Sequence, residues 1–317
     1  MKSTQPGLTI PLASVKPLEN LQGYRSRCLL AAREALDAEA INRTDCPSCD
    51  QALQAWGNVE GFDYRRCGQC GGFFLSNVSS PDRWAALLKT VAEYKLAPDG
   101  FHAPISTSRN ESVYLPRLDW IRHTLRLHGL TEPRILEVTA PPSVFTDVLK
   151  KSGAFREVVP ISEEDGAGGA EGSAGAAVLL ESLDRTSDPG GLLSAVVQRL
   201  ERGGLVFITS IVASGFDVAT LGLRNRYIYP PDRTNCFALE SLVKLAKRCG
   251  LEPVEVSTPG ALDVEIVDGH RRQYPEVALS PFERQLLDSE PERREAFQTF
   301  LQENLMSSFA RVVGRVL

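Results

Sequence analysis

The sequence predicts an α/β protein in which a small metal-binding module precedes a mainly parallel sheet. Two CxxC pairs, Cys46 with Cys49 and Cys67 with Cys70, are separated by seventeen residues. From residue 134 onward, apolar runs of strand length alternate with helical segments, a pattern typical of parallel sheets. A chain of 317 residues, 43% of them hydrophobic, is long enough for one full-sized core and one smaller module.

The two CxxC pairs have the spacing of one tetrahedral zinc site. Residues 53–66 between them are expected to form the strands that bring the second turn opposite the first. Gly68 and Gly71 suit tight turns, whereas Asp50 stands where the first turn would usually have glycine. Two disulfides, or unrelated cysteines, are the alternative interpretations. Four thiolates leave no open coordination position, so the predicted zinc is structural rather than catalytic.

The composition argues against several classes of protein. A net charge of -5 opposes a general affinity for nucleic-acid phosphates. No apolar run reaches the length needed to cross a membrane, and the first residues lack the sustained apolar segment of a secretory signal. Seven cysteines, an odd number, fit a reducing compartment. We therefore expect a cytoplasmic protein without membrane insertion.

The residues before the sheet predict helices on both sides of the metal-binding module. The expected elements are helices at residues 22–40, 81–94 and 115–128, and a short strand at residues 71–75. A serine of the pair Ser79-Ser80 is expected to cap the second helix, which Pro81 opens. Residues 98–104, with two prolines and a glycine, predict a boundary. The predicted division is coil and helix at residues 1–44, zinc ribbon at 45–80, helical linker at 81–130 and α/β domain at 131–317.

The α/β domain is predicted from six apolar runs and the helices between them. The expected strands are residues 134–138, 158–161, 177–180, 205–210, 253–257 and 308–316. The expected helices are residues 143–152, 189–200, 237–249 and 282–305. Asp188 is the expected N-cap of the second of these helices. Residues 163–175, rich in Gly, Ala and Glu, predict a surface loop.

Several segments, in order, resemble one bacterial family. CPSCD at residues 46–50 and YRRCGQCGGFFLSNVSSP at residues 64–81 resemble the zinc-ribbon opening of a family of class I S-adenosylmethionine-dependent methyltransferases. Further segments similar to that family's landmarks are LESLDRTSDP at 180–189, LERGG at 200–204, NCFALESL at 235–242 and STPGALDV at 257–264. The resemblance implies a Rossmann-like class I methyltransferase sheet with an N-terminal zinc ribbon and a helical linker. It also implies S-adenosylmethionine as cofactor.

The segment that would bind the cofactor departs from the family pattern. In the family, an acidic residue after the first strand is followed by Gly-x-Gly-x-Gly, because glycine lets the backbone approach the ligand closely. Residues 136–143, LEVTAPPS, keep the acid as Glu137 but have Thr139, Pro141 and Ser143 in place of the glycines. Two consecutive prolines also remove two backbone donors. The resemblance implies a degenerate motif in which Glu137 and Thr139 are the remaining candidate contacts to the cofactor.

The adenosine side of the implied pocket is also reduced. In the family, an acidic residue after the second strand holds the ribose, and a helix and a third strand follow. Here only about fifteen residues separate the second predicted strand from the next, which hardly accommodates a helix and a strand. Glu163, Glu164 or Asp165 could still hold a ribose, and Glu163 is the candidate nearest the strand.

A basic and aromatic loop is the candidate acceptor site. It contains Arg224, Arg226, Tyr227, Tyr229 and Arg233, which could clamp a phosphate or a carboxylate. The alternative interpretation is a solvated loop packed by its tyrosines.

The sequence identifies no catalytic base. His270 is expected at the surface. Arg185 stands where the family often has histidine, and arginine stays protonated at neutral pH.

Two functional hypotheses follow, and they leave open whether the chain is an enzyme. In the first, a methyltransferase-fold protein has lost productive cofactor binding and acts as a non-catalytic binding or scaffolding protein for a protein partner. In the second, an active methyltransferase acts on a small-molecule or sugar intermediate, and positioning supplies most of the rate acceleration. The acidic net charge opposes a third hypothesis, a zinc-ribbon protein that binds nucleic acid.

Overall fold

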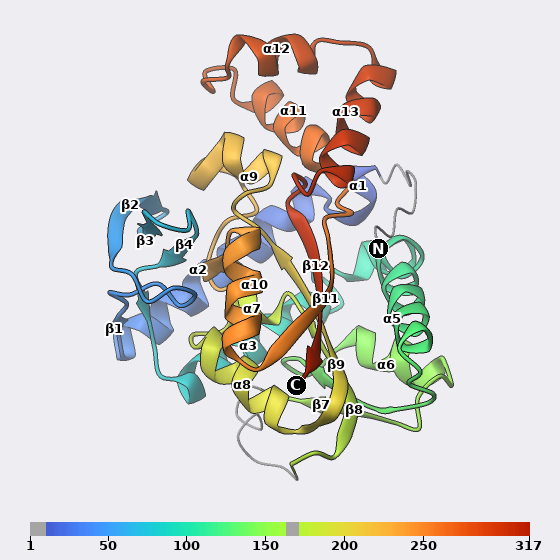
Figure 1. Cartoon of the computed structure of the whole chain (residues 1–317). Coiled ribbons are helices and arrows are strands. Elements are labelled where there is room, and N and C mark those ends of the chain that lie inside the picture. The colour runs from blue at the N-terminus through green and yellow to red at the C-terminus, as the bar shows by residue number, and fades with distance from the viewer. Residues whose placement is uncertain (1–10, 163–170) are drawn as a thin grey trace.

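A computed structural model describes residues 11–162 and 171–317, which form three sheets surrounded by helices (Figure 1). The strands are β1 (Ile41–Asn42), β2 (Leu53–Val59), β3 (Phe62–Cys67), β4 (Phe73–Leu75), β5 (Asn77–Val78), β6 (Arg134–Val138), β7 (Glu157–Ile161), β8 (Ala174–Leu180), β9 (Leu200–Ile211), β10 (Asn235–Cys236), β11 (Leu251–Ser257) and β12 (Phe309–Val316). The helices are α1 (Leu12–Val15), α2 (Leu18–Ala38), α3 (Pro81–Leu96), α4 (Ser106–Arg109), α5 (Leu115–Leu127), α6 (Val144–Lys151), α7 (Ser182–Arg185), α8 (Pro189–Gln198), α9 (Phe216–Leu221), α10 (Leu239–Arg248), α11 (Asp263–Gln273), α12 (Pro281–Leu287) and α13 (Pro291–Glu303). Short helical turns are η1 (Ala103–Ile105), η2 (Asn110–Tyr114) and η4 (Gly222–Arg224).

The largest sheet has six strands in the order β11-β12-β9-β8-β6-β7. Strands β6 to β9 are parallel, and β12 pairs antiparallel with both β9 and β11. The described β7 is an edge strand of this sheet, with β6 as its partner. The strand order agrees with the Rossmann-like class I methyltransferase sheet that the sequence predicts.

Alternation along the buried strands divides the core of this sheet into two faces. Ile135, Val178 and Phe207 pack on one face against α5 and α6. Leu136 and Leu179 point to the other face, which α8 and α10 cover. Because helices cover both faces, the central strands are apolar along their whole length, as expected of a parallel sheet.

The ribbon region forms a second sheet that includes a strand from far along the chain. Strands β2, β3 and β4 form an antiparallel meander, as predicted. The short β10 extends this sheet, because Asn235 pairs with Phe74 and Cys236 with Phe73. The aromatic rings of Phe74 and Phe237 also contact each other edge to face at 5.6 Å. The ribbon is therefore joined to the α/β domain by backbone pairing and by packing.

One local prediction is wrong, and another is confirmed only in part. Residues 282–305 form α12 and α13 rather than one helix, because Glu290 is extended and Pro291 starts the second helix without a donor N–H. Ser80 occupies the N-cap position of α3, but its side chain makes no capping hydrogen bond. Its hydroxyl instead donates to a carboxylate oxygen of Glu39 at 2.7 Å.

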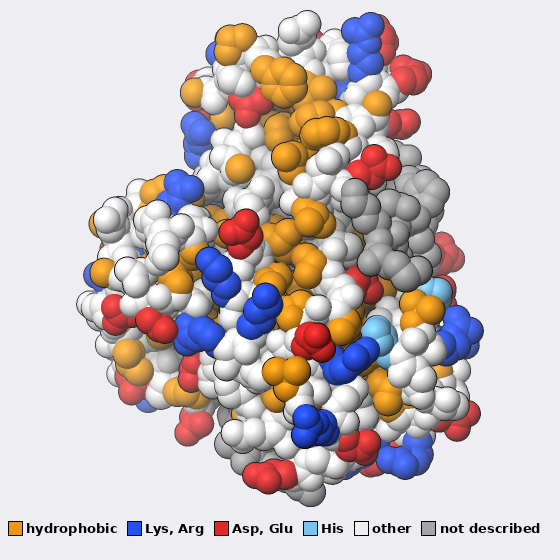
Figure 2. All heavy atoms as spheres, viewed as in Figure 1, with side chains coloured by type: hydrophobic (Ala, Val, Ile, Leu, Met, Phe, Trp, Pro, Cys, Tyr) orange, Lys and Arg blue, Asp and Glu red, His pale blue; other side chains and the backbone are white. Residues whose placement is uncertain are grey.

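Helices α11, α12 and α13 form a cap beyond the carboxyl ends of the parallel strands (Figure 1). Hydrophobic side chains lie on the visible face of the cap and continue onto the domain below it (Figure 2). Exposed apolar residues of the cap and of the segment after it include Phe282, Phe300, Leu305 and Met306. Within the described ranges, no helix combines the length and the apolar character needed to cross a bilayer.

Candidate functional site

The two cysteine turns have matching backbone geometry. The amide of Asp50 donates to the carbonyl of Cys46, and the amide of Gly71 donates to the carbonyl of Cys67, both at 3.0 Å. Asp50 and Gly71 both have positive φ, 56° and 76°. Asp50 therefore occupies the left-handed position that glycine fills in the second turn, as the sequence indicated.

The four cysteine sulfurs converge on one point. Their Sγ atoms all lie within 4.8 Å of one another. Cys46 and Cys70 are 3.7 Å apart, and Cys49 and Cys67 are 3.5 Å apart, distances too long for disulfide bonds. A tetrahedral zinc with bonds of about 2.3 Å would separate its sulfurs by about 3.8 Å. The spacing and the donor chemistry therefore fit a zinc ion with four thiolate ligands.

The ribbon holds the segment that carries Arg233. The hydroxyl of Tyr64 donates to the carbonyl of Arg233 at 2.8 Å, and the amide of Leu75 donates to the carbonyl of Thr234 at 2.9 Å. Asn235 in turn donates to the carbonyls of Leu183 and Thr186, each at 2.8 Å. Hydrogen bonds therefore lead from the ribbon to both ends of α7.

A cavity of about 380 Å³ lies at the carboxyl ends of β6, β8 and β9. In open α/β sheets this edge is where ligands bind. The lining includes Val138 of β6, Leu180 of β8 and Ile211 of β9. Segments from α1 to α5 and the start of the cap close the remaining sides. No residue of β7 contributes to the described lining.

Glu137 and Thr139 both line this cavity, but other side chains already hold Glu137. Its carboxylate is 3% exposed and accepts hydrogen bonds from the hydroxyls of Ser143, at 2.8 Å, and Thr146. Burial raises the pKa of Glu137 above its ordinary value, against the two hydrogen bonds. Ser143 also caps α6 by accepting from the Thr146 amide. A residue that replaces a family glycine therefore binds the acid that the family pattern retains.

Glu181, directly after β8, is surrounded by three arginines. Arg117 and Arg233 approach its carboxylate at 2.9 and 2.7 Å, and Arg185 approaches at 3.6 Å. Burial raises the pKa of Glu181, but the three guanidinium groups outweigh it and hold that pKa well below the usual range. Arg185 also pairs with Asp232 at 2.9 Å. This network neutralises the acidic side of the cavity within the protein itself.

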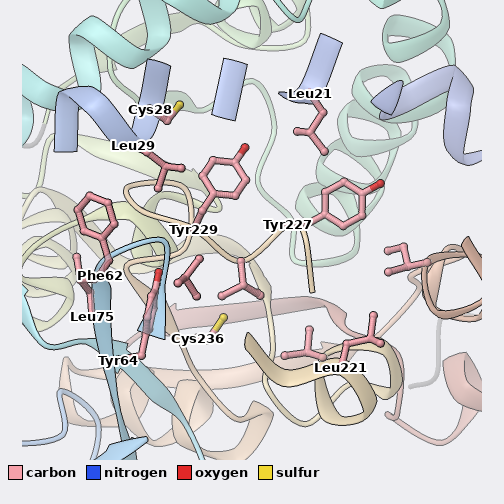
Figure 3. Packing of buried hydrophobic residues seen from close by; sticks show 14 of the residues in the cluster. Leu21, Cys28, Leu29, Phe62, Tyr64, Leu75, Leu221, Tyr227, Tyr229 and Cys236 are labelled. Carbon is pink, nitrogen blue, oxygen red and sulfur yellow. The ribbon is translucent and has the colours of Figure 1, made fainter. Parts of the chain in front are cut away.

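The predicted acceptor loop is divided between the cavity and the surface. Tyr227, Tyr229 and Arg233 line the cavity, whereas Arg224 is exposed and Arg226 is half-buried, and neither lines it. Tyr229 points toward α2 near Cys28 and Leu29, and Tyr227 lies near Leu21 (Figure 3). The tyrosines therefore pack into the core and also form part of the cavity wall, and the segment around them is mostly buried rather than solvated. Glu163 lies outside the described residues.

Sequence reasoning missed most of the charged lining of the cavity. Its seven basic side chains are Lys16, Lys95, Arg109, Arg117, Arg185, Arg233 and Arg311. Its four acidic side chains are Glu137, Glu181, Asp232 and Asp263. Five of the basic residues lie on α3, α4, α5, β12 and the residue after α1, where they resemble ordinary solvated charges in the sequence. A lysine within the apolar stretch of a helix only weakly indicates a buried site, and no sequence motif connects the basic residues of the lining.

His270 and Asp184 are two further titratable residues, but neither lines the cavity. His270 is only 5% exposed, so its predicted surface position is wrong. It lies on α11 with its ring 4.9 Å from that of Tyr274 and does not line the cavity. Asp184 is fully buried, and burial raises its pKa to about 7 although it accepts from Ser210 at 2.6 Å and from the Ile211 amide at 2.9 Å. Asp184 does not line the cavity either.

Comparison with known proteins gives only distant structural likeness. No protein-family model and no curated protein matches the sequence. A similar solved structure is 1,6-didemethyltoxoflavin-N1-methyltransferase of Burkholderia thailandensis, bound to 1,6-didemethyltoxoflavin and S-adenosylhomocysteine. Its sequence identity is 11% and its TM-score 0.43, over 83% of this chain and 99% of that chain.

Two further similar structures are S-adenosylmethionine-dependent methyltransferases. The protein from Archaeoglobus fulgidus has 12% identity and a TM-score of 0.38, over 62% of this chain and 93% of that chain. The protein from Mesorhizobium loti has 14% identity and a TM-score of 0.35, over 61% of this chain and 95% of that chain. Likeness of this degree does not assign a substrate or a partner.

Proposed function

We propose that this chain is a methyltransferase-fold protein with a structural zinc and a degenerate cofactor pocket, which acts as a non-catalytic binding or scaffolding protein. The observation that carries the proposal is the state of the two carboxylates at the ends of β6 and β8. Ser143 and Thr146 hold Glu137, and three arginines hold Glu181. Both acids already have partners within the protein, and these partners would compete with the hydroxyls or the amino group of a cofactor.

The charge of the cavity supports the same proposal. S-Adenosylmethionine carries a sulfonium, an ammonium and a carboxylate, and so has one net positive charge at neutral pH. The cavity lining has seven basic and four acidic side chains, and burial favours the neutral form of Glu137. Because charges interact strongly in a partly desolvated site, a positive cavity disfavours a cationic ligand.

The cofactor loop supports it as well. Thr139, Pro141 and Ser143 have side chains where the family pattern has glycine, and Pro141 and Pro142 have no backbone N–H to donate. The backbone of this loop therefore has fewer donors for the methionine carboxylate or the ribose.

Calorimetric titration tests this proposal. The zinc-loaded chain is titrated with S-adenosylmethionine and with S-adenosylhomocysteine, and thermal unfolding is followed at millimolar concentrations of each. We expect no heat of binding and no thermal stabilisation. Micromolar binding of either compound would overturn the proposal. The triple variant Thr139→Gly, Pro141→Gly, Ser143→Gly is the matched arm, because a gain in cofactor affinity there locates the defect in the loop.

A second candidate function is an active methyltransferase for a small-molecule or sugar intermediate. It is favoured by the cavity itself, which opens at the edge of the sheet where α/β enzymes bind ligands and includes Tyr227, Tyr229 and Arg233. Micromolar binding in the same titration would favour this function, and transfer of a labelled methyl group to an acceptor would then be measured.

A further inference from the structure

We propose that the central cavity binds a small amphipathic organic anion, with a carboxylate or phosphate held by Lys16, Lys95 and Arg109 and an apolar body against the aromatic wall. This inference deepens the proposed function by giving the chemical class of ligand for the non-catalytic cavity. The three cations come from the residue after α1, from α3 and from α4, and all three line the one cavity.

Lys16, Lys95 and Arg109 are three of the four lining cations without an ion pair among the described residues; the fourth, Arg311 of β12, lies over the Trp120 ring, 4.7 Å from its centroid. Among the described residues, none of the three takes part in an ion pair, whereas Arg117, Arg185 and Arg233 share Glu181 and Asp232. The Nζ of Lys16 lies over the Tyr227 ring, 4.2 Å from its centroid. Arg109 donates through Nη1 to a backbone carbonyl at 3.0 Å, but its buried Nε has no hydrogen-bond partner within the described part of the chain.

Desolvation and mutual repulsion act on the same group of residues. Burial, together with Arg185 and Arg109, lowers the pKa of Lys95 to about 7. Burial, together with Arg109 and Lys95, lowers the pKa of the neighbouring His102 to about 4. The buried Nε2 of His102 also lacks a hydrogen-bond partner among the residues described. An anion bound here would give a direct partner to cations that have no ion pair among the described residues, and charge-assisted contacts of this kind are stronger than neutral ones.

The rest of the cavity is suited to an apolar body. Aromatic lining residues are Tyr24, Phe101, Tyr114, Phe145, Tyr227, Tyr229 and Phe309. Leu21, Leu88 and Val91 add aliphatic surface from α2 and α3. A small inorganic ion alone would leave this surface uncovered, so the geometry favours an organic anion over free phosphate.

The probes are four compounds with one ring system and different charges. Naphthyl phosphate and naphthoate supply the two anionic groups, naphthol is the neutral control and naphthylmethylamine is the cationic control. Each is titrated calorimetrically into the zinc-loaded chain. We expect an anion to bind about a hundredfold more tightly than naphthol, since two or three charge-assisted contacts form. Tighter binding of naphthyl phosphate assigns a phosphate ester, and tighter binding of naphthoate assigns a carboxylate.

Charge-neutralising variants test the residues. Lys16→Gln, Lys95→Gln and Arg109→Gln should each weaken binding of the tighter anion about tenfold. Lys89→Gln is the matched control, because Lys89 lies on α3 with Lys95 but is exposed and does not line the cavity. Zinc content and thermal midpoint are recorded for every variant. Lys95→Met keeps the test valid if a polar variant folds poorly, since an apolar side chain suits a half-buried position.

The outcomes separate this inference from the proposed function. If neither anion binds more tightly than naphthol at millimolar concentration, or if the three variants bind as the wild type does, the inference is wrong. Either result leaves the proposed loss of cofactor binding untouched. If the anion binds and S-adenosylhomocysteine also binds without competing, the inference stands while the proposed function fails.

Discussion

The ribbon with its four cysteines and the central cavity both bring ionisable groups together, but these groups differ in the partners they have. In the ribbon, four sulfurs from two neighbouring turns converge within 4.8 Å, a geometry that one zinc ion would satisfy completely. In the cavity, cations from distant parts of the chain meet, and acidic partners reach only some of them. In the ribbon, a single metal ion would give every converging sulfur a partner. In the cavity, some lining cations have no acidic partner among the described residues, and these cations are not expected to contribute to the stability of the fold.

Loss of the metal is expected to have the largest effect. Cys67→Ser removes one of four ligands, and structural zinc sites contribute apparent binding free energies of about 10 kcal/mol or more. We expect the wild type to contain about one zinc per chain and the variant to lose it, with loss of protection in β2, β3 and β4. Metal analysis and hydrogen exchange measure these changes. Cys249→Ser is the control, because Cys249 is half-buried and lies outside the sulfur cluster. If the purified wild type contained no zinc, the proposed structural metal site of the ribbon would be wrong.

Breaking the arginine network should have the next largest effect. Arg233 is 4% exposed and contacts Glu181 at 2.7 Å, so Arg233→Met leaves a buried acid with less compensation. Removing one partner of a buried pair costs about 3–5 kcal/mol, which urea denaturation would measure. Arg248→Met is the control, because the Arg248–Asp50 pair is exposed and worth less than about 1 kcal/mol. Equal losses in the two variants would contradict the structural role of the network.

The sequence predicts the ribbon well because its information is local. The CxxC spacing, the strands between the pairs and the left-handed position of Asp50 all depend on neighbouring residues. The parallel strands are likewise predicted by short apolar runs. Residues 163–170 lie outside the described ranges, so the role of Glu163 stays a prediction.

The cavity could not be predicted in the same way. Glu137 and Thr139 follow a strand at the expected edge, so the sequence finds them. Lys16, Lys95 and Arg109 reach the cavity only after three separate helical segments pack together, and nothing in their local sequence distinguishes them from surface charges. Sequence spacing carries no information about which of these cations lacks an acidic partner, because that depends on the tertiary fold.

A smaller effect tests whether the two regions are coupled. Tyr64 of β3 is 1% exposed, and its hydroxyl donates to the carbonyl of Arg233. Tyr64→Phe leaves this buried carbonyl without that donor and should cost about 1–2 kcal/mol in urea denaturation. Tyr274→Phe is the control, since Tyr274 is 42% exposed. If the ribbon supports the cavity, Tyr64→Phe also weakens anion binding. A variant that loses stability but binds as the wild type does would show two independent regions.

The smallest expected effect is a gain in stability, whereas the variants above lose stability. Lys95 has a folded-state pKa of about 7 against an ordinary value of 10.5. Between these values the unfolded chain binds more protons than the folded chain, so this group makes stability rise with pH. Burial, Arg185 and Arg109 lower the Lys95 pKa, while Asp232 and Glu181 oppose them. Lys95→Met should therefore raise the thermal midpoint by about 2–4 °C at pH 6, as expected for roughly 1 kcal/mol, and the gain should vanish near pH 10.

Thermal unfolding of Lys95→Met and Lys89→Met at three pH values tests whether the charge of Lys95 destabilises the folded state. Lys89 is exposed, so its replacement should not change the pH dependence. A destabilised Lys95→Met, or a gain that is the same at every pH, would mean that Lys95 is a stabilising part of the cavity wall. A gain confined to low pH, together with weaker binding of the anion, would mean that the fold tolerates an uncompensated cation because a ligand uses it. No such exchange of stability for ligand binding is expected in the ribbon, because a zinc ion bound by its four cysteines would stabilise the fold itself.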